Sequence, residues 1–183
     1  MNINDMIDRY DLRFATRFDG GKLVKTGNIF IGRPQQVQKD NALVDIKAAK
    51  PEIIACLEAQ EAEERATLEE RERKIAAIPG LKEIQDAQND VAAWNKEFRE
   101  SFADVGGLGV RKKPEYDFDA MYAEYPVAAA YLKALSYSMA TNDMKAAAGK
   151  TAIDAILSGA DPAAAIQEME SAWGNHCMDH VWD

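Results

Sequence analysis

Residues 58–74 read EAQEAEERATLEERERK, and they lie inside an apolar repeat that continues from residue 54 to residue 78. Glutamate, alanine, arginine and lysine all favour the helical state, so this run predicts a long helix that is mostly solvated. Pro51 suits its first position, and Pro79-Gly80 ends it. A protein that exposes such a helix usually uses it to display a binding surface or to exclude another molecule.

The apolar residues of this helix fall on heptad spacing, but Glu61 and Glu64 occupy the middle of the seam, so any pairing there is loose or exposed. A second amphipathic helix follows, marked by Leu81, Ile84, Val91, Trp94, Phe98 and Phe102. Because the connection through Pro79-Gly80 is short, residues 47–104 are predicted to form an antiparallel, coiled-coil-like helical hairpin. The sequence leaves open whether this hairpin pairs within one chain or between two.

The N-terminal segment, residues 1–46, predicts a small antiparallel β-sheet. Residues 12–18 alternate between apolar and polar side chains, and Asp19-Gly20-Gly21 follows as a turn signal. Residues 22–26 would return, Gly27-Asn28 would turn again, and residues 29–31 would make a third short strand. Two or three short strands are not stable alone in water, so this sheet should dock on the helices or on a partner.

The rest of the chain predicts a linker and a helical bundle. Residues 105–115 are rich in glycine and basic residues, and residues 116–183 carry apolar repeats with helix caps and alanine-rich faces that permit close helix approach. One of the predicted helices covers residues 143–157, and another starts at Asp161-Pro162. The expected fold class is mainly α with a small N-terminal antiparallel β-sheet (α+β), a long helical hairpin and a C-terminal helical bundle.

Composition and charge limit the classes of function that the chain could have. The chain has 183 residues, of which 47% are hydrophobic and 29% charged, as is usual for a globular protein. Its formal net charge of −9 argues against a general binder of nucleic acid or anionic membranes, because such binding needs a local excess of Lys and Arg. A basic protein partner suits this charge better.

Cysteine usage and hydropathy bear on localisation. Cys56 and Cys177 lie far apart in the sequence and fit no disulfide framework, which indicates a reducing compartment. The first residues lack the basic and apolar pattern of a signal peptide, and no segment reaches the length of a membrane span. We therefore expect a cytoplasmic protein.

Acidic residues on the long helix are the first candidate site. Carboxylates pair well with arginines that would otherwise hold nucleic acid, so this face could engage a basic groove of a partner. The residues expected to bind the partner are Glu61, Glu64, Glu69, Glu70 and Glu72. The alternative is a plain solvated helix face, because interleaved Arg and Lys stand at spacings that allow internal ion pairs.

Two smaller candidate sites follow from the sequence. Arg111, Lys112 and Lys113 form the main basic cluster and could touch a nucleic-acid backbone that a partner already holds, or could simply be solvated linker charges. His176, Cys177 and His180 have helical spacing for a metal site, but no second ligand pair accompanies them, so a helix end without metal is the expected reading. No catalytic arrangement of Ser, His, Cys or acids is evident, and no cofactor is expected.

A resemblance supplements these patterns. Tyr125-Pro126-Val127-Ala128-Ala129-Ala130-Tyr131-Leu132-Lys133-Ala134, together with Ala148-Gly149-Lys150, Met169-Glu170 and Trp173, resembles small uncharacterised proteins carried by phages and prophages of gut Firmicutes. It covers mainly the C-terminal third of the chain and carries no catalytic residues. Proteins of this size and origin include inhibitors of bacterial defence, among them anti-CRISPR proteins that act on Cas9.

The sequence therefore leads to one main functional hypothesis and two alternatives. The main one is a non-enzymatic, protein-binding inhibitor from a phage or mobile element, an anti-CRISPR that acts on a Cas9-type nuclease with its guide RNA in the cytoplasm of the bacterial host. A homodimer and a secondary contact with nucleic acid are left open. The alternatives are a phage structural or assembly protein that self-associates and, in third place, a metal-dependent enzyme.

Overall fold

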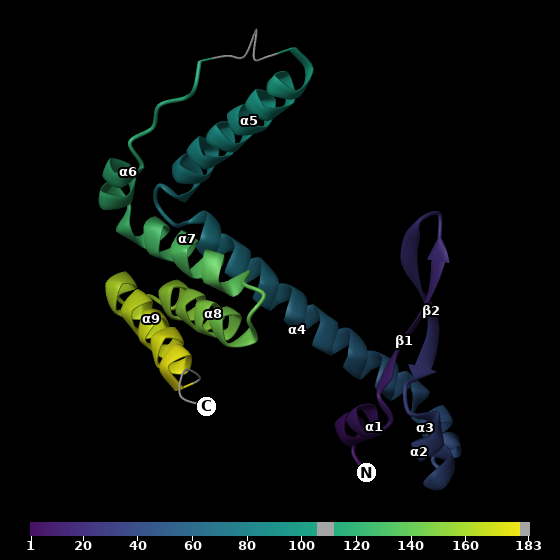
Figure 1. The fold of residues 1–183 in the computed structure, drawn as a ribbon. Coiled ribbons are helices and arrows are strands. Elements are labelled where there is room, and N and C mark those ends of the chain that lie inside the picture. Colours follow the sequence, from purple (N-terminus) through teal and green to yellow (C-terminus); the bar gives the residue numbers. More distant parts are fainter. Residues whose placement is uncertain (106–111, 180–183) are drawn as a thin grey trace. The chain divides into compact units, whose positions relative to one another are not determined.

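The computed structural model describes residues 1–105 and 112–179, and most of these residues are helical (Figure 1). The chain divides into two compact units, Met1–Glu70 and Arg71–Asp183, with the boundary inside one long helix. A two-stranded antiparallel sheet lies near the N-terminus, and the other elements are helices. The expected fold class, mainly α with a small N-terminal antiparallel sheet, is confirmed. The finer division into four sequence segments stays a prediction.

The β-hairpin of the N-terminal unit consists of β1 (Leu12–Asp19) and β2 (Lys22–Ile31). Asp19-Gly20-Gly21 makes the predicted turn, but Gly27-Asn28 does not reverse the chain, so the prediction of a third strand was wrong. Phe14 pairs with Ile29 and Thr16 with Lys25, which leaves a bulge in β2 between these pairs. Gly27 adopts a left-handed backbone there, and the Thr26 hydroxyl donates to the Ala15 carbonyl across the strands at 3.0 Å.

Short helices hold the base of this hairpin, and the sequence patterns did not predict them. They are α1 (Ile3–Tyr10), α2 (Pro34–Lys39) and α3 (Leu43–Ala48). The Asn2 side chain caps α1 by accepting from the Asp5 amide at 2.8 Å. Together with the start of α4 (Lys50–Ala76), these elements enclose one core. The core contains Met6, Ile7, Tyr10, Leu12, Val37, Ala42, Ile46, Ile53 and Leu57.

Ile53 is completely buried in this N-terminal core. Replacing it with Ala leaves a cavity in addition to removing apolar surface, so we expect the N-terminal unit to lose about 2–5 kcal/mol of stability. Hydrogen exchange should show loss of protection in α1, α3 and the first turns of α4, with unchanged protection in the helices of the C-terminal unit. Equal losses in both units would contradict the division at Glu70.

Asp40, which directly follows α2, connects α2 to α1 through polar contacts. The Arg9 guanidinium donates to its carboxylate at 2.8 Å, the Gln36 amide donates at 3.0 Å, and the Tyr10 hydroxyl donates at 3.2 Å. The Arg9 and Gln36 hydrogen bonds are the main cause that lowers the pKa of Asp40 from 3.8 to about 2. The carboxylate is therefore favoured in the folded state relative to the unfolded state.

The Asp40 contacts should contribute to stability in a pH-dependent way. Because the folded pKa lies below the unfolded value, the contribution is complete above about pH 4 and is lost as the pH falls towards 2. We expect Asp40→Asn to lower the melting temperature of the N-terminal unit at neutral pH, and the difference from the wild type to shrink as the pH falls through the folded pKa of about 2. A difference that stays constant over this range in thermal melts would rule out the ionised carboxylate as its cause.

The C-terminal unit contains α5 (Leu81–Val105), α6 (Phe118–Glu124), α7 (Pro126–Ser138), α8 (Asp143–Leu157) and α9 (Pro162–Asp179). The side chains of Asp117, Asn142 and Asp161 accept hydrogen bonds from the Ala120, Lys145 and Ala164 amides, which fixes three helix starts. Pro126 is the first residue of α7, and the break between α6 and α7 lies at Tyr125. The predicted helix over residues 143–157 is confirmed.

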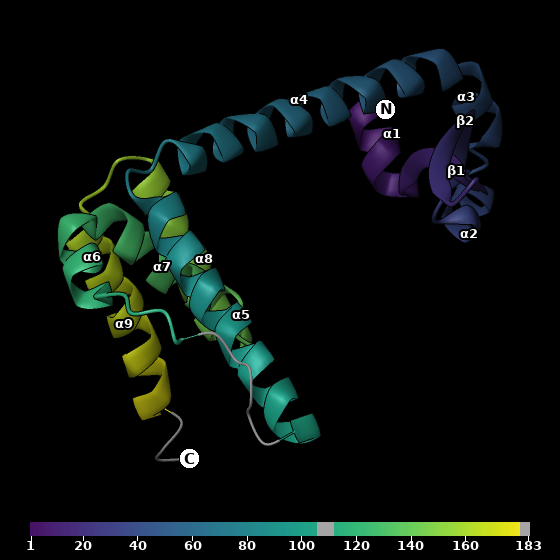
Figure 2. The ribbon, with the colours of Figure 1, turned by 90° about the horizontal axis from the view of Figure 1, so that it is seen from above.

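Helices α7, α8 and α9 pack against one another, and α5 contacts α7 (Figures 1 and 2). Small side chains make this close packing possible: Ala128 and Ala134 are fully buried, and Gly149 of α8 lies against the backbone of α7. The larger core residues are Leu81, Ile84, Tyr131, Ile153, Ile156 and Met169. The C-terminal helical bundle predicted from the alanine-rich faces is therefore present.

The long helices begin and end close to the predicted residues. Helix α4 ends at Ala76 and α5 starts at Leu81, so the short connection at Pro79-Gly80 is as expected. Gly80 has a left-handed backbone, and a Cβ there would overlap the ring of Tyr125. The pairing of α4 with α5 as an antiparallel hairpin stays a prediction.

Candidate functional site

The middle of α4 is the most exposed helical surface of the N-terminal unit. Ile53 and Leu57 are buried at its start, and Ile75 contacts the C-terminal core near its end. Between them the side chains are exposed apart from a half-buried Glu61, and even Leu68 has an exposed fraction of 61%. The helical conformation of this segment is therefore stabilised by the helix propensity of its residues and by the packing of the two ends of α4.

Helical geometry shows which of the glutamates predicted to bind a partner lie on the same side of α4. Each residue of an α-helix turns by about 100°, so Glu61, Glu64, Glu69 and Glu72 fall within about 140° of the helix circumference. We call these four residues the acidic side of α4. Glu70, nine residues after Glu61, lies on the opposite side of the helix, so the structure does not bring it together with the other four. Arg65 falls on the acidic side, which keeps a net negative charge.

Ion pairs in this region differ from those expected within one helix. The Arg71 guanidinium contacts Asp154 of α8 at 3.2 Å, so this cation does not neutralise the glutamates of its own helix. Lys25 of β2 forms an ion pair with Glu61, which connects the β-hairpin to the acidic side. Among the residues that the structure describes, Glu64, Glu69 and Glu72 form no ion pair. Their carboxylates are exposed and available to an external cation.

The predicted basic cluster has partners within the chain. Lys112 contacts Glu115 at 3.1 Å, and the Lys113 ammonium lies 5.9 Å from the centre of the Trp94 ring. Both lysines are exposed, and Arg111 lies outside the described residues. The pairing with Glu115 reduces the net positive charge available to a phosphate backbone, so the nucleic-acid contact stays a prediction with less to support it.

The candidate metal ligands fall where side chains are not described. His176 and Cys177 belong to the last turns of α9, of which the structure gives the helical backbone, and His180 lies outside the described residues. Among the residues whose side chains the structure describes, no group of three or more His, Cys, Asp or Glu is arranged to hold a metal ion.

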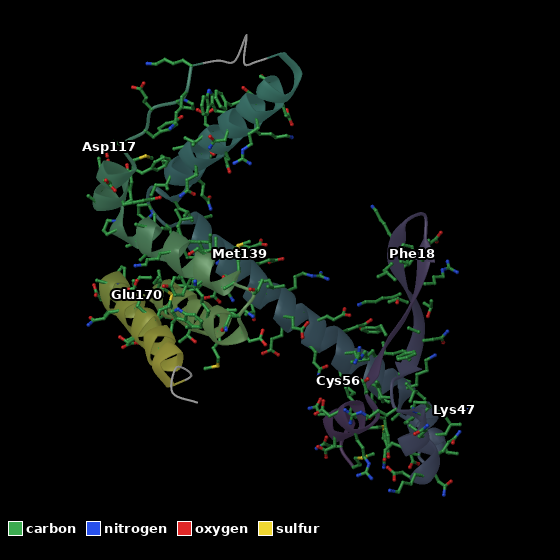
Figure 3. All side chains as sticks on the ribbon, in the orientation of Figure 1. Phe18, Lys47, Cys56, Asp117, Met139 and Glu170 are labelled. Atoms are coloured by element: carbon green, nitrogen blue, oxygen red, sulfur yellow. The ribbon has the colours of Figure 1, made fainter. Side chains whose placement is uncertain are left out.

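A groove in the C-terminal unit was not predicted from the sequence. It has a volume of about 680 Å³ and a mainly apolar lining that includes Ala129, Leu132 and Ile166. Lys133 of α7 forms an ion pair at 2.5 Å with Glu170 of α9 on its wall. Figure 3 labels Glu170. The Gln88 amide donates to the Tyr122 hydroxyl at 3.1 Å. The repeated alanines of α7 and α9 were the only signal in the sequence, because small side chains leave space between helices. The lining suits an apolar side chain.

Comparison with known proteins adds no family to these observations. Searches against protein-family models, curated proteins and solved structures found no match. In the part of the chain that is described, none of the helices combines the length and the apolar character needed to cross a membrane.

Proposed function

We propose that this protein is a non-enzymatic inhibitor from a phage or mobile element that binds a basic bacterial nuclease of the Cas9 type. The binding surface is the acidic side of α4, namely Glu61, Glu64, Glu69 and Glu72. The observation that supports this proposal best is the exposure of three of these carboxylates without an ion pair in the described chain. The resemblance of the C-terminal third to phage and prophage proteins supplies the class of partner.

The chemistry of the surface suggests how inhibition would work. A nuclease that holds guide RNA or DNA does so with arginines and lysines in a channel, and carboxylates on a rigid helix can pair with the same cations. Helix α4 has 27 residues, which corresponds to about 40 Å at 1.5 Å per residue, so several turns can lie along such a channel. Occupation of the cations would exclude the nucleic acid or hold a mobile domain in place.

Electrostatic recognition of this kind has a kinetic signature. Complementary charges accelerate association, and salt screens them over about 8 Å at physiological ionic strength. The association rate of the complex should therefore fall steeply as salt is raised, while the dissociation rate changes less.

The experiment that tests the proposal is a titration of DNA cleavage by a guide-loaded Cas9-type nuclease with the purified protein. Cleavage should stop when inhibitor and nuclease reach equal concentration, and the two should co-elute in gel filtration. A stoichiometric endpoint separates a binding inhibitor from an enzyme, which would inactivate an excess of nuclease. Unchanged cleavage at a large excess of the protein, with no co-elution across a panel of such nucleases, would overturn the proposal.

A further inference from the structure

A cleft of about 240 Å³ lies beside β2 in the N-terminal unit. Its lining comes from β2, from α3 and from the first residue of α4, and none of the lining residues belongs to β1. The cleft therefore opens at the outer edge of β2. Its apolar part consists of Ile29, Ile31, Leu43 and Ile46. Ile46 belongs to the N-terminal core, and Ile29 and Ile31 pack against that core, so these side chains form a fixed apolar floor.

The backbone at this edge of β2 is open to a further strand, because the sheet has only β1 and β2. The Gly32 amide donates to the Asp11 carbonyl at 3.0 Å. Backbone groups of an antiparallel strand point alternately towards and away from the neighbouring strand. Phe30 therefore turns its N–H and C=O to β1, whereas Ile29 and Ile31 turn theirs outward. Among the described residues, none hydrogen-bonds to these outward groups.

Two lysines give the cleft a positive charge. Lys47, which Figure 3 labels on α3, and Lys50 at the start of α4 both line it, and no carboxylate does. The Lys50 ammonium donates to the Asn28 side chain at 3.0 Å. Within the described part of the chain, neither lysine forms an ion pair. The cleft thus combines an apolar floor, two available cations and an open strand edge.

We propose that the cleft binds an extended segment of another protein, in which acidic side chains flank an apolar one. The segment adds to the edge of β2 as a third strand, with its main chain bonded to Ile29 and Ile31 and every second side chain facing the cleft. A third strand also stabilises the sheet, because a two-stranded hairpin alone is marginal in water. A nucleic acid fits less well, because the aliphatic floor has no aromatic ring on which a base could stack.

The size of the cleft supports a peptide segment as the occupant. Pockets for drug-sized ligands have volumes of about 300–1,000 Å³, and this cleft, at about 240 Å³, is smaller. It has room for one or two side chains of a strand whose main chain remains outside. Affinity would then come mainly from main-chain hydrogen bonds, and specificity from the side chains in the cleft.

A designed peptide tests the inference. It has five residues, with valine at the centre, glutamate at both ends and threonine between them, so valine and both glutamates fall on one face of a strand. NMR titration of the full chain should show saturable binding. Hydrogen exchange at the Ile29 and Ile31 amides should slow, whereas that of Phe30, which already faces β1, should change little. A peptide of the same composition with both glutamates next to the valine presents them to the opposite face, and should bind at least about tenfold more weakly.

Charge reversal in the protein provides the second arm. Lys47→Glu with Lys50→Glu should weaken binding of the first peptide at least about tenfold, and this variant should instead prefer a peptide with lysine in place of glutamate. The exchange of preference separates the proposed contact from misfolding. As a matched control, Lys82→Glu with Lys150→Glu makes the same change in net charge at exposed positions on α5 and α8, and should leave binding nearly unchanged.

Absence of saturable binding at millimolar peptide, or an affinity that the Lys47 and Lys50 variant retains, would overturn the inference. So would binding of a single-stranded oligonucleotide in place of the peptide, because the lysines would then serve a phosphate backbone. Protection of the Ile29 and Ile31 amides that rises with protein concentration, without peptide, would show that a second copy occupies the edge and would also overturn it. The inference does not depend on the proposed function, since the Lys47 and Lys50 variant should still inhibit the nuclease.

Discussion

Replacement of Glu64, Glu69 and Glu72 by Lys is expected to weaken binding to a Cas9-type nuclease at least about 100-fold. Close charge pairs across a protein interface have coupling energies of about 1.5–7 kcal/mol, and each 1.4 kcal/mol is a factor of ten in affinity. Reversal also adds repulsion between like charges. The fold should tolerate the change, because the three side chains are exposed and Lys has nearly the helix propensity of Glu.

A matched control separates this local effect from the change in net charge. Asp8, Asp86 and Glu168 are exposed acids on helices other than α4, and their replacement by Lys changes the net charge by the same amount. This control should inhibit cleavage nearly as well as the wild type, apart from a modest fall in association rate. Equal losses for both variants would show that only the overall charge matters, and unchanged affinity of the first would remove the acidic side from the proposal.

Position around the helix gives a second control within α4 itself. Glu70 lies on the opposite side from Glu61, so Glu70→Lys should have a small effect on affinity. The sequence prediction grouped Glu70 with the other glutamates because a run of acidic residues shows how dense the charge is. It does not show on which side of the helix each carboxylate lies. Direction follows from the rotation of about 100° per residue once the segment is known to be one uninterrupted helix.

The sequence predicted the long elements well, because helix signals accumulate over many residues. Pro79-Gly80 separated α4 from α5, and the predicted helix over residues 143–157 has the bounds of α8. The short helices α1, α2 and α3 were missed because fewer than nine residues give little more than two turns of pattern. Gly27-Asn28 was read as a turn, whereas pairing of Phe14 with Ile29 keeps the strand continuous through a bulge.

The candidate site was harder to predict, because its properties depend on contacts between distant residues. Nothing in the sequence indicates that Arg71 contacts Asp154 or that Lys25 contacts Glu61. These two pairs determine how much charge the acidic side of α4 retains. The sequence predicted a loose or exposed seam at Glu61 and Glu64, and Leu68, close to them on α4, has an exposed fraction of 61%.

Gly149→Ala should destabilise the C-terminal unit strongly, although the same change stabilises most helices. A Cβ at this position would lie 2.7 Å from the Ala134 carbonyl oxygen and 2.8 Å from the Tyr137 carbonyl carbon, both in the backbone of α7. Backbone atoms of a packed helix do not move aside, so α7 and α8 must separate. We expect a loss of about 2–3 kcal/mol, on the scale of overpacked cores, and a fall in melting temperature of about 10 °C.

Gly174 provides the matched comparison, because it also lies inside a helix but a Cβ there would meet no atom within 4 Å. Gly174→Ala should therefore stabilise α9 by about 0.5–1 kcal/mol, the ordinary helix-propensity gain. Thermal unfolding followed by circular dichroism, with hydrogen exchange in α7 and α8, measures both variants. Opposite signs for one substitution at two helical glycines would establish that close approach of α7 and α8 holds the bundle together, and a stabilising Gly149→Ala would show that these helices have room to separate.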